Sequence, residues 1–157
     1  MKIQGNIRFA RPEDVPGIIK LCHLHATYEK AVYTFNGQAT RLVQDLFSEP
    51  PKVYCLVVEH DGQLIGYATY MKQYATWDAG EYIYLDCLFI REFARRLGLG
   101  EKLLRRIQGE GQALGCDLMQ WQTPDFNTRA MKFYRRIGAK SKSKERFFIA
   151  MRGVKNR

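Results

Sequence analysis

The sequence predicts one three-layer α/β domain, in which helices flank a central sheet of mixed antiparallel and parallel strands. Apolar residues at helical spacing alternate along the whole chain with short runs rich in β-branched and aromatic residues. No repeat, low-complexity stretch or linker interrupts them, and 157 residues are enough for one domain with a sizeable core. We therefore expect residues 1–157 to form a single domain.

The first third of the chain is predicted to hold a strand and two helices. Residues 3–10 are typical of a strand, and Pro12 stands where proline favours the first turn of a helix. A loop over 31–37 separates this helix from a shorter one over 40–47. The apolar residues of the first helix recur every three to four positions: Val15, Ile18, Ile19, Cys22 and Ala26.

The middle of the chain is predicted to hold three antiparallel strands. Residues 53–60 and 63–74 are rich in strand-forming residues, and the intervening Asp61-Gly62 is typical of a hairpin turn. A second turn over 75–80 leads into a third strand over 81–90. This third strand ends just before a glycine-containing turn.

The last part of the chain is predicted to alternate helices and strands. A helix over 98–113 precedes a strand over 116–123, and a second helix begins at Asn127 and stops before Gly138. Residues 145–151 are expected to form a final strand. The strands before and after the first of these helices should lie parallel, joined by a right-handed crossover.

Composition narrows the functional classes. Hydrophobic residues make up 46% and charged residues 26%, which is ordinary for a globular domain. We find no apolar run long enough to span a membrane and no signal-peptide core near Met1, so we expect a cytoplasmic protein without membrane contact.

Histidines and cysteines give no sign of a metal site. His23 and His25 are two positions apart on the first helix and cannot face one another, so surface or packing roles are expected. The cysteines form no C-x-x-C pair, which favours buried free thiols over a metal or disulfide framework; only Cys87 is a candidate nucleophile. They are Cys22, Cys55, Cys87 and Cys116.

The formal net charge of +9 is concentrated in two segments. Residues 91–106 hold six basic residues against two acids, and residues 140–157 hold seven against one. A localised basic surface suits a polyanion, either a phosphorylated cofactor or nucleic acid. For the C-terminal segment, we favour a solvated basic tail.

The turn after the third strand has the form of an anion site. Leu88-Phe89-Ile90 ends the strand, and Arg95-Arg96-Leu97-Gly98-Leu99-Gly100 opens a helix. The first turn of a helix has unpaired N–H donors, and glycines let a phosphate approach the backbone. The Gly-Lys-Ser/Thr of a Walker loop and the third glycine of the dinucleotide fingerprint are both absent.

Two motifs resemble a known superfamily. Arg95-x-x-Gly98-x-Gly100 resembles the Q/R-x-x-G-x-G/A motif of the GNAT superfamily of N-acetyltransferases. The pattern from Asn127 through Ala130, Phe133 and Tyr134 to Gly138-Ala139 resembles the C-terminal motif of that superfamily, with the expected strand between the two. The element order matches over essentially the whole chain, so the resemblance implies a three-layer GNAT-like fold.

A second level of similarity concerns one branch of the superfamily. Tyr28-Glu29, Tyr67-Ala68-x-Tyr70 and the run from Tyr84 to Ile90 resemble the diamine (spermidine/spermine and thialysine) acetyltransferases. The chain departs from that branch at Asp86-Cys87, where the usual pair is Glu-Asp, and at Arg96, where many members have glycine. The departure at Asp86-Cys87 bears on both the catalytic base and the preference for polyamines.

The resemblance implies direct transfer of the acetyl group of acetyl-CoA, as co-substrate and without a metal, to the primary amine of a small molecule. Residues 96–100 would bind the pyrophosphate, with charge from Arg95 and Arg96. The strand end would pair with the pantetheine arm, and a backbone N–H near Phe89 would hold the thioester oxygen. A bulge in this strand and its splay from the parallel neighbour would open the cofactor cleft. The implied cofactor-binding residues are Leu88, Phe89, Ile90, Arg95, Arg96, Leu97, Gly98, Leu99, Gly100, Asn127 and Tyr134.

The implied catalytic residues are Tyr134 and Asp86. Tyr134 stands where family members carry the general acid, although its place in an apolar stripe also suits a core aromatic. Asp86 stands where the branch has a glutamate linked to base catalysis; it is equally open as a substrate anchor or a structural acceptor. The candidate acceptor-binding residues are Glu29, Trp77 and Asp78.

The acceptor and the assembly are less constrained by the sequence. Diamines, polyamines or lysine-like amino acids are favoured over aminoglycoside-type amines and protein lysines. A basic nucleic-acid-binding module and a non-catalytic CoA sensor are the alternatives from other classes, and the nucleic-acid module is disfavoured because no groove-reading helix motif is present. The branch implies a homodimer.

Overall fold

The computed structural model describes residues 2–152, which divide after Pro124 into two compact units. The first unit contains the whole sheet and all but one of the described helices. The second contains a single helix and an extended segment. Whether residues 1–157 behave as one domain stays a prediction.

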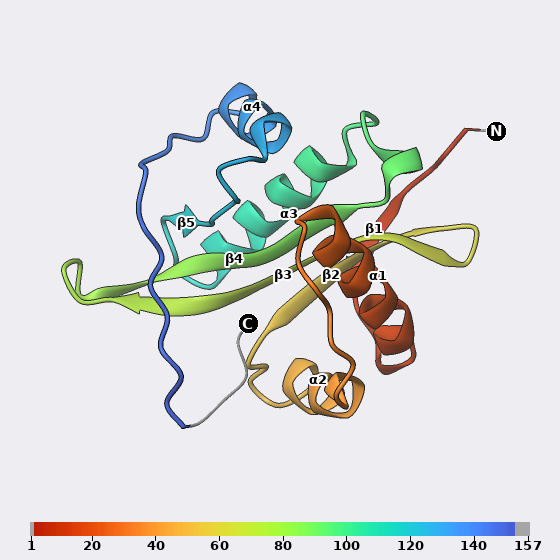
Figure 1. The fold of residues 1–157 in the computed structure, drawn as a ribbon, viewed down its shortest axis with the longest axis horizontal. Helices are drawn as coiled ribbons and strands as arrows, with labels where there is room; N and C mark the ends of the chain where they lie inside the picture. Colours follow the sequence, from red (N-terminus) through yellow and green to blue (C-terminus); the bar gives the residue numbers. More distant parts are fainter. Residues whose placement is uncertain (1, 153–157) are drawn as a thin grey trace. The chain divides into compact units, whose positions relative to one another are not determined.

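The first unit is built on a five-stranded sheet (Figure 1) with the order β1-β2-β3-β4-β5. The strands are β1 (Asn6–Phe9), β2 (Tyr54–His60), β3 (Gln63–Ala75), β4 (Gly80–Ile90) and β5 (Met119–Gln120). The first four pair antiparallel in chain order, and β5 runs parallel to β4. The mixed sheet and the parallel crossover predicted from the sequence are both confirmed.

Helices flank this sheet. The α-helices of the first unit are α1 (Val15–Tyr28), α2 (Gln38–Leu46) and α3 (Leu99–Ala113), with short 3₁₀ turns η1 (Pro12–Asp14) and η2 (Glu92–Ala94). The turn η2 was not predicted. Pro12 opens η1, which passes directly into α1, so proline sets the start of the helical segment as expected.

Alternation along the strands divides the core into two faces, because successive strand residues point to opposite sides of a sheet. Val57, Tyr67 and Phe89 face one side and pack in one cluster with apolar residues of α1 and with Leu46 of α2. On the other side α3 packs closely on β4: a Cβ added to Gly111 would lie 2.8 Å from Cγ1 of Ile83. Leu99, Leu103, Leu104 and Ile107, which recur at helical spacing along α3, are buried.

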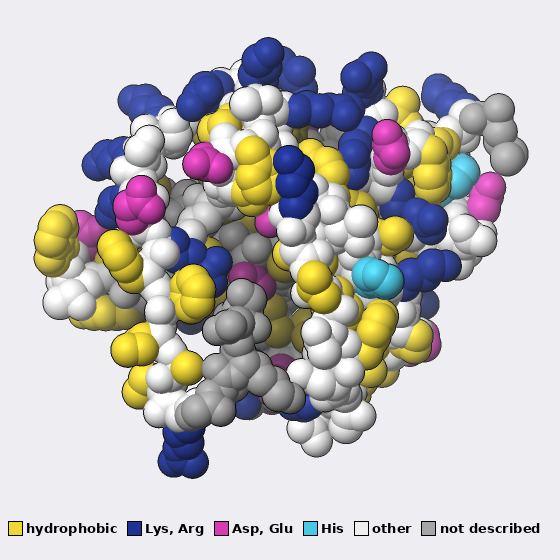
Figure 2. Space-filling model, viewed as in Figure 1, with side chains coloured by type: hydrophobic (Ala, Val, Ile, Leu, Met, Phe, Trp, Pro, Cys, Tyr) yellow, Lys and Arg dark blue, Asp and Glu magenta, His cyan; other side chains and the backbone are white. Residues whose placement is uncertain are grey.

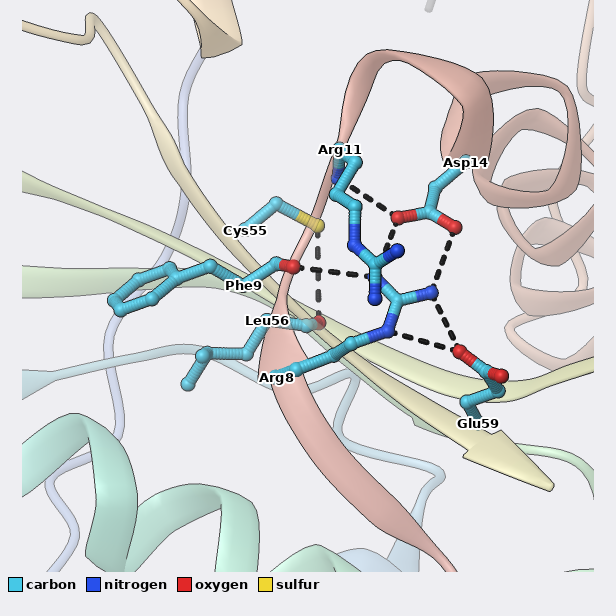
Figure 3. Close-up of polar contacts among 7 residues, drawn as sticks. All are labelled: Arg8, Phe9, Arg11, Asp14, Cys55, Leu56 and Glu59. Carbon is cyan, nitrogen blue, oxygen red and sulfur yellow. Dashed lines mark hydrogen bonds and ion pairs between the residues drawn. The ribbon is translucent and has the colours of Figure 1, made fainter.

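An ion-pair network closes the N-terminal edge of the sheet (Figure 3). The Arg8 guanidinium on β1 donates to both oxygens of Asp14 at 2.7 and 2.9 Å and to Glu59 Oε2 on β2 at 2.6 Å. Asp14 Oδ2 also accepts the N–H of Arg11 at 2.7 Å. One half-buried guanidinium thus ties β1, η1 and β2 together, and bonding to Arg8 lowers the pKa of Asp14.

Two of the predicted strands differ from the structure. The strand expected over 116–123 is reduced to β5, Met119–Gln120. The strand expected over 145–151 is wrong: residues 145–150 have no strand assignment, and Phe147, Phe148, Ile149 and Met151 are exposed. Strand-forming residues favour a ladder only where a neighbouring strand supplies hydrogen bonds and a surface to pack on, and the described part of this segment has neither.

The second unit contains α4 (Thr128–Arg136). Oδ1 of Asn127 accepts the N–H of Ala130 and caps the start of the helix. Gly138 has a φ of 102° just beyond the end, and the N–H of Ala139 donates to the Tyr134 carbonyl. Both ends predicted from the sequence are therefore confirmed. Over residues 2–152 we find no helix long and apolar enough to cross a membrane.

Candidate active site

The strand β4 carries a bulge at Asp86. Thr69 of β3 pairs with Cys87 and Tyr70 pairs with Leu85, so Asp86 is an extra residue without a partner on β3. A bulge of this kind bends the strand and redirects the side chains around it. The bulge expected in this strand from the resemblance is thus present, and it falls on the residue singled out as the candidate base.

The opposite edge of β4 opens just before this bulge. β5 pairs only with Ile83 and Tyr84, and the remaining residues of β4 have no parallel partner within the described part of the chain. Their backbone groups on this side, apart from the Ile90 carbonyl that accepts from Arg95, are available to an extended, peptide-like ligand. The strand end at Leu88, Phe89 and Ile90 lies within this open stretch.

The helix that follows presents uncapped N–H groups. α3 begins at Leu99 with Gly98 as its N-cap, and no side chain of the described residues caps it. The Gly98 carbonyl accepts the Lys102 N–H at 3.0 Å, which leaves the N–H groups of the first turn directed out of the helix. Together with the helix dipole, these donors form a site suited to a phosphate.

Two residues of the turn adopt left-handed backbone conformations. Gly98 has a φ of 78° and Arg96 a φ of 65°. Glycine adopts this region without strain, whereas arginine does so at a cost. Arg96, where the resembled family often has glycine, therefore stands at a position whose backbone conformation favours glycine. The Arg96 side chain is exposed, as expected for a residue that offers its charge to an anion.

Arg95 is oriented differently from its neighbour. Its Nε donates to the Ile90 carbonyl at 2.8 Å, and its guanidinium lies over the rings of Tyr28, at 4.4 Å, and Phe89, at 5.4 Å. It therefore braces the turn against α1 and the end of β4. Any contribution of Arg95 to phosphate binding comes from a guanidinium already held by these contacts.

Hydrogen bonds link Tyr67, His25 and Glu29 next to Phe89. The His25 ring stacks on Phe89 with centroids 5.2 Å apart, its Nδ1 bonds to the Tyr67 hydroxyl at 2.9 Å, and its Nε2 bonds to Glu29 Oε2 at 2.7 Å. The structure thus brings the predicted residues Glu29 and Phe89 into one neighbourhood. His25 and Tyr67 were not predicted as site residues. The i,i+4 spacing of His25 and Glu29 could have predicted the contact between these two residues. No local pattern could have predicted the contact with Tyr67, which lies 42 positions further along the chain.

Asp86 and Cys87 occupy contrasting environments. The Asp86 side chain is exposed rather than enclosed by its apolar neighbours, and Oδ2 accepts the Cys87 thiol at 3.6 Å. Burial, with a further contribution from Asp86, raises the pKa of Cys87 to about 12. Cys87 is therefore a protonated thiol at neutral pH, which argues against a nucleophilic role.

Trp77 and Asp78 lie elsewhere. Both are exposed at the turn of the β3–β4 hairpin, which extends beyond the rest of the sheet (Figure 1). Gly80 and Phe89 are nine positions apart along β4, which corresponds to roughly 30 Å at about 3.3 Å per residue. The structure does not bring these two residues together with Glu29.

The second unit carries the two remaining predicted residues. Asn127 caps α4 through Oδ1. Tyr134, half-buried on the same helix, lies with its ring centroid 5.3 Å from that of Phe133.

The charged surface agrees with a polyanionic ligand. Figure 2 shows Lys and Arg side chains spread over the visible face, with fewer Asp and Glu side chains among them.

Within residues 2–152, no group of three or more His, Cys, Asp or Glu side chains could hold a metal ion.

Comparison with known proteins adds three findings. The sequence model of the acetyltransferase (GNAT) family matches residues 19–139. The chain is 31% identical to a thialysine N-epsilon-acetyltransferase of Bos taurus over 141 residues, which cover 85% of this chain and 82% of that protein. It is 25% identical to an L-ornithine N5-acetyltransferase of Arabidopsis thaliana over 180 aligned positions, covering 86% and 79%.

A solved structure shares the fold. An aminoglycoside N-acetyltransferase in complex with CoA superposes with a TM-score of 0.75 at 18% identity, over 96% of this chain and 97% of that one. The thialysine enzyme belongs to the branch that the sequence resembles. The family match covers the open β4 edge, the uncapped α3 and the whole of α4. The chain therefore belongs to the acetyltransferase (GNAT) family and is an acetyl-CoA-dependent N-acetyltransferase.

Proposed function

We propose that this enzyme acetylates the primary amine of a small cationic acceptor, a diamine, a polyamine or a lysine-like amino acid. One observation carries the proposal: the open edge of β4 leads directly to an uncapped helix start, and the Glu29 carboxylate is bonded to the imidazole that stacks on Phe89 of that strand. The edge suits the cofactor, and the carboxylate suits a cation. The names of the thialysine and ornithine relatives support the same class of acceptor.

The cofactor would lie along the strand end and the helix start. Leu88, Phe89 and Ile90 would pair with the amides of the pantetheine arm, and the N–H groups from Arg96 to Gly100 would bind the pyrophosphate. The exposed guanidinium of Arg96 adds charge for the phosphates. Asn127 would reach the pantetheine arm, as the family resemblance implies.

Two proton transfers complete the reaction. An alkyl ammonium must lose a proton before its nitrogen can attack the thioester, and the CoA thiolate must gain one as it leaves. We assign the second transfer to the Tyr134 hydroxyl, whose half-buried position on α4 is compatible with this role. Asp86 would receive the first proton through water, because its exposed carboxylate lies at the bulge next to the open edge.

The acceptor would be held by its positive charge. Glu29 offers a carboxylate with a side chain about one-third exposed (35%). Trp77 and Asp78 at the hairpin turn are separated from Phe89 along β4, so they would contact only a long acceptor or a site completed by another copy of the chain.

Measurement of CoA release over an amine panel tests the proposal. The panel contains 1,4-diaminobutane, spermidine, lysine, thialysine, ornithine, an aminoglycoside and a lysine-containing peptide, with acetyl-CoA saturating. We expect the largest kcat/KM among the diamines and the lysine-like amino acids. A preference for the aminoglycoside or the peptide would overturn the acceptor assignment. Binding of acetyl-CoA without release on any amine would favour a CoA sensor.

We also propose a cytoplasmic homodimer. The four cysteines are free thiols, which supports a reducing compartment. Phe147, Phe148, Ile149 and Met151 are exposed in succession, and burying them requires a partner surface. Sedimentation velocity of the enzyme and of a Phe147→Ser/Ile149→Ser variant tests this: we expect a dimer for the first and a shift to monomer for the second.

A further inference from the structure

His25 connects two groups that the reaction scheme above leaves unrelated. Its Nδ1 lies 2.9 Å from the Tyr67 hydroxyl on β3, and its Nε2 lies 2.7 Å from Glu29 Oε2 at the end of α1. Its ring is stacked on Phe89 and meets Tyr67 edge-on, at centroid distances of 5.2 and 5.8 Å. Both ring nitrogens and the ring face are thereby engaged.

The Glu29 carboxylate sets the direction of these hydrogen bonds, because a carboxylate can only accept, and Tyr67 completes the arrangement. Tyr67 is 1% exposed, and burial raises the pKa of its hydroxyl far above the ordinary value, so it stays protonated. Cys22 and Cys87 both interact with this hydroxyl, and burial raises the pKa of each, so they stay neutral thiols beside it. Nε2 of His25 therefore carries the proton that is donated to Glu29, and in the neutral imidazole Nδ1 accepts the hydrogen bond of the Tyr67 hydroxyl.

The hydrogen bond from His25 stabilises the Glu29 carboxylate at the C-terminal end of α1. It is the C-cap residue of α1, where the negative end of the helix dipole disfavours a carboxylate. The Nε2–H of His25, in the last turn of the same helix, offsets that repulsion and restricts the carboxylate to one direction. A cation that binds there is attracted both by the carboxylate and by the helix end.

We propose that Tyr67 and His25 are positioning residues that hold the Glu29 carboxylate as the docking point for the second, non-reacting positive charge of the acceptor. The inference rests on the proposed function and narrows it to dicationic acceptors. Phe89 lies against the face of the imidazole, whereas Glu29 bonds to its edge, so the carboxylate is offset laterally from the Phe89 ring at the strand end. The reacting nitrogen and the anchored charge therefore occupy different places, and an amine with a single charge gains nothing from Glu29.

Steady-state kinetics with 1,4-diaminobutane and with butylamine test the assignment. In the His25→Leu variant, which keeps the side-chain volume and removes both hydrogen bonds, we expect KM for the diamine to rise about tenfold and kcat to change less than about twofold. KM for butylamine should stay within about twofold of the wild-type value. Glu29→Gln should show the same pattern.

Two further variants separate positioning from a structural role. His25→Gln keeps an N–H that can reach Glu29 and an oxygen that can accept from Tyr67, so we expect KM for the diamine within about threefold of wild type. Tyr67→Phe keeps the buried ring and removes only the donor, so its KM should lie between those of wild type and His25→Leu. Thermal unfolding of each variant establishes that it is folded under the assay conditions.

The outcomes are distinct. An unchanged KM in His25→Leu, an equal rise for both amines, or a loss confined to kcat would each overturn the positioning role while leaving the proposed function intact. Failure of the wild type itself to acetylate any amine, although it binds acetyl-CoA, would overturn the proposed function and this inference together.

Discussion

The guanidinium of Arg95 lies 4.4 Å from the centre of the Tyr28 ring, and this contact joins the start of the glycine turn to the end of α1. Tyr28 itself contacts Phe89 at the end of β4, with ring centroids 6.1 Å apart. The predicted cofactor turn and the predicted acceptor side of the site thus share one aromatic support. We therefore expect a substitution in the cofactor turn to affect the acceptor side of the site, and the reverse.

Replacement of Arg95 by alanine should lower the free energy of unfolding by about 1–2 kcal/mol, because a cation–π contact and a hydrogen bond to the Ile90 carbonyl are lost together. Urea denaturation measures this. The matched control is Arg96→Ala, whose side chain is exposed and whose effect should stay within about 0.5 kcal/mol. Equal effects of the two changes would contradict the bracing role of Arg95.

Arg96→Gly should separate backbone strain from charge. Removal of the side chain at a φ of 65° should raise the free energy of unfolding by about 0.5–1 kcal/mol. The same change should weaken acetyl-CoA binding by about three- to tenfold, because a cation near the phosphates is lost. Arg96→Gln, which loses only the charge, should weaken binding without gaining stability. Calorimetry measures acetyl-CoA binding, and urea denaturation measures the free energy of unfolding. Equal changes in stability for Arg96→Gly and Arg96→Gln would contradict the prediction of backbone strain at Arg96.

Gly98 and Gly109, at the N-cap and in the interior of α3, should respond to alanine with opposite signs. A Cβ meets no atom within 4 Å at either position, so sterics do not distinguish them. At Gly98, with a φ of 78°, alanine should cost about 1 kcal/mol and weaken acetyl-CoA binding. At Gly109 it should add about 0.5–1 kcal/mol through helix propensity and leave binding unchanged. Stabilisation by both changes would mean that the Gly98 backbone relaxes.

The Arg8 network should make stability fall in acid. Bonding to Arg8 lowers the folded-state pKa of Asp14, so its contribution is fully present above the unfolded pKa, near 4. It is lost as the pH falls through the folded value. Asp14→Asn should therefore cost about 2 kcal/mol at pH 7 and progressively less below about pH 4.

Chemical denaturation between pH 7 and pH 2 measures the difference in free energy of unfolding between the wild type and Asp14→Asn. The control is Asp45→Asn, because the pair of Asp45 with Lys52 is solvent-exposed at 3.2 Å and should contribute less than about 0.5 kcal/mol. A pH-independent cost for Asp14→Asn would show that the carboxylate charge is not what Arg8 holds.

Tyr134→Phe should lower kcat by about a hundredfold or more, because the departing thiolate loses its proton donor. The dissociation constant of acetyl-CoA should stay within about twofold, because the ring is retained. Phe133→Leu on the same helix is the control and should leave kcat nearly unchanged. Turnover by Tyr134→Phe at the wild-type rate would remove Tyr134 from the reaction.

Local signals account for much of what could be predicted. The glycine turn, the proline at the start of the first helical segment and Gly138 after α4 each act on the backbone within a few residues, so their effects are visible in the sequence. The bulge and the splay of β4 were predicted only through resemblance to a family. Their positions at Asp86 and beyond Tyr84 depend on register against β3 and β5, which single-strand periodicity does not contain.

The sequence by itself determined the order of strands and helices as far as α4, the parallel crossover and the glycine-containing start of α3, because hydrophobic period and glycine conformations are properties of consecutive residues. Only the tertiary structure decided that Arg95 braces α1, that His25 lies between Tyr67 and Glu29, and that residues 145–150 form no strand. Each of these depends on a partner distant in sequence, or on the lack of one among the described residues. Contacts of that kind determine where a side chain points, but they produce no periodic pattern in the sequence from which they could be predicted.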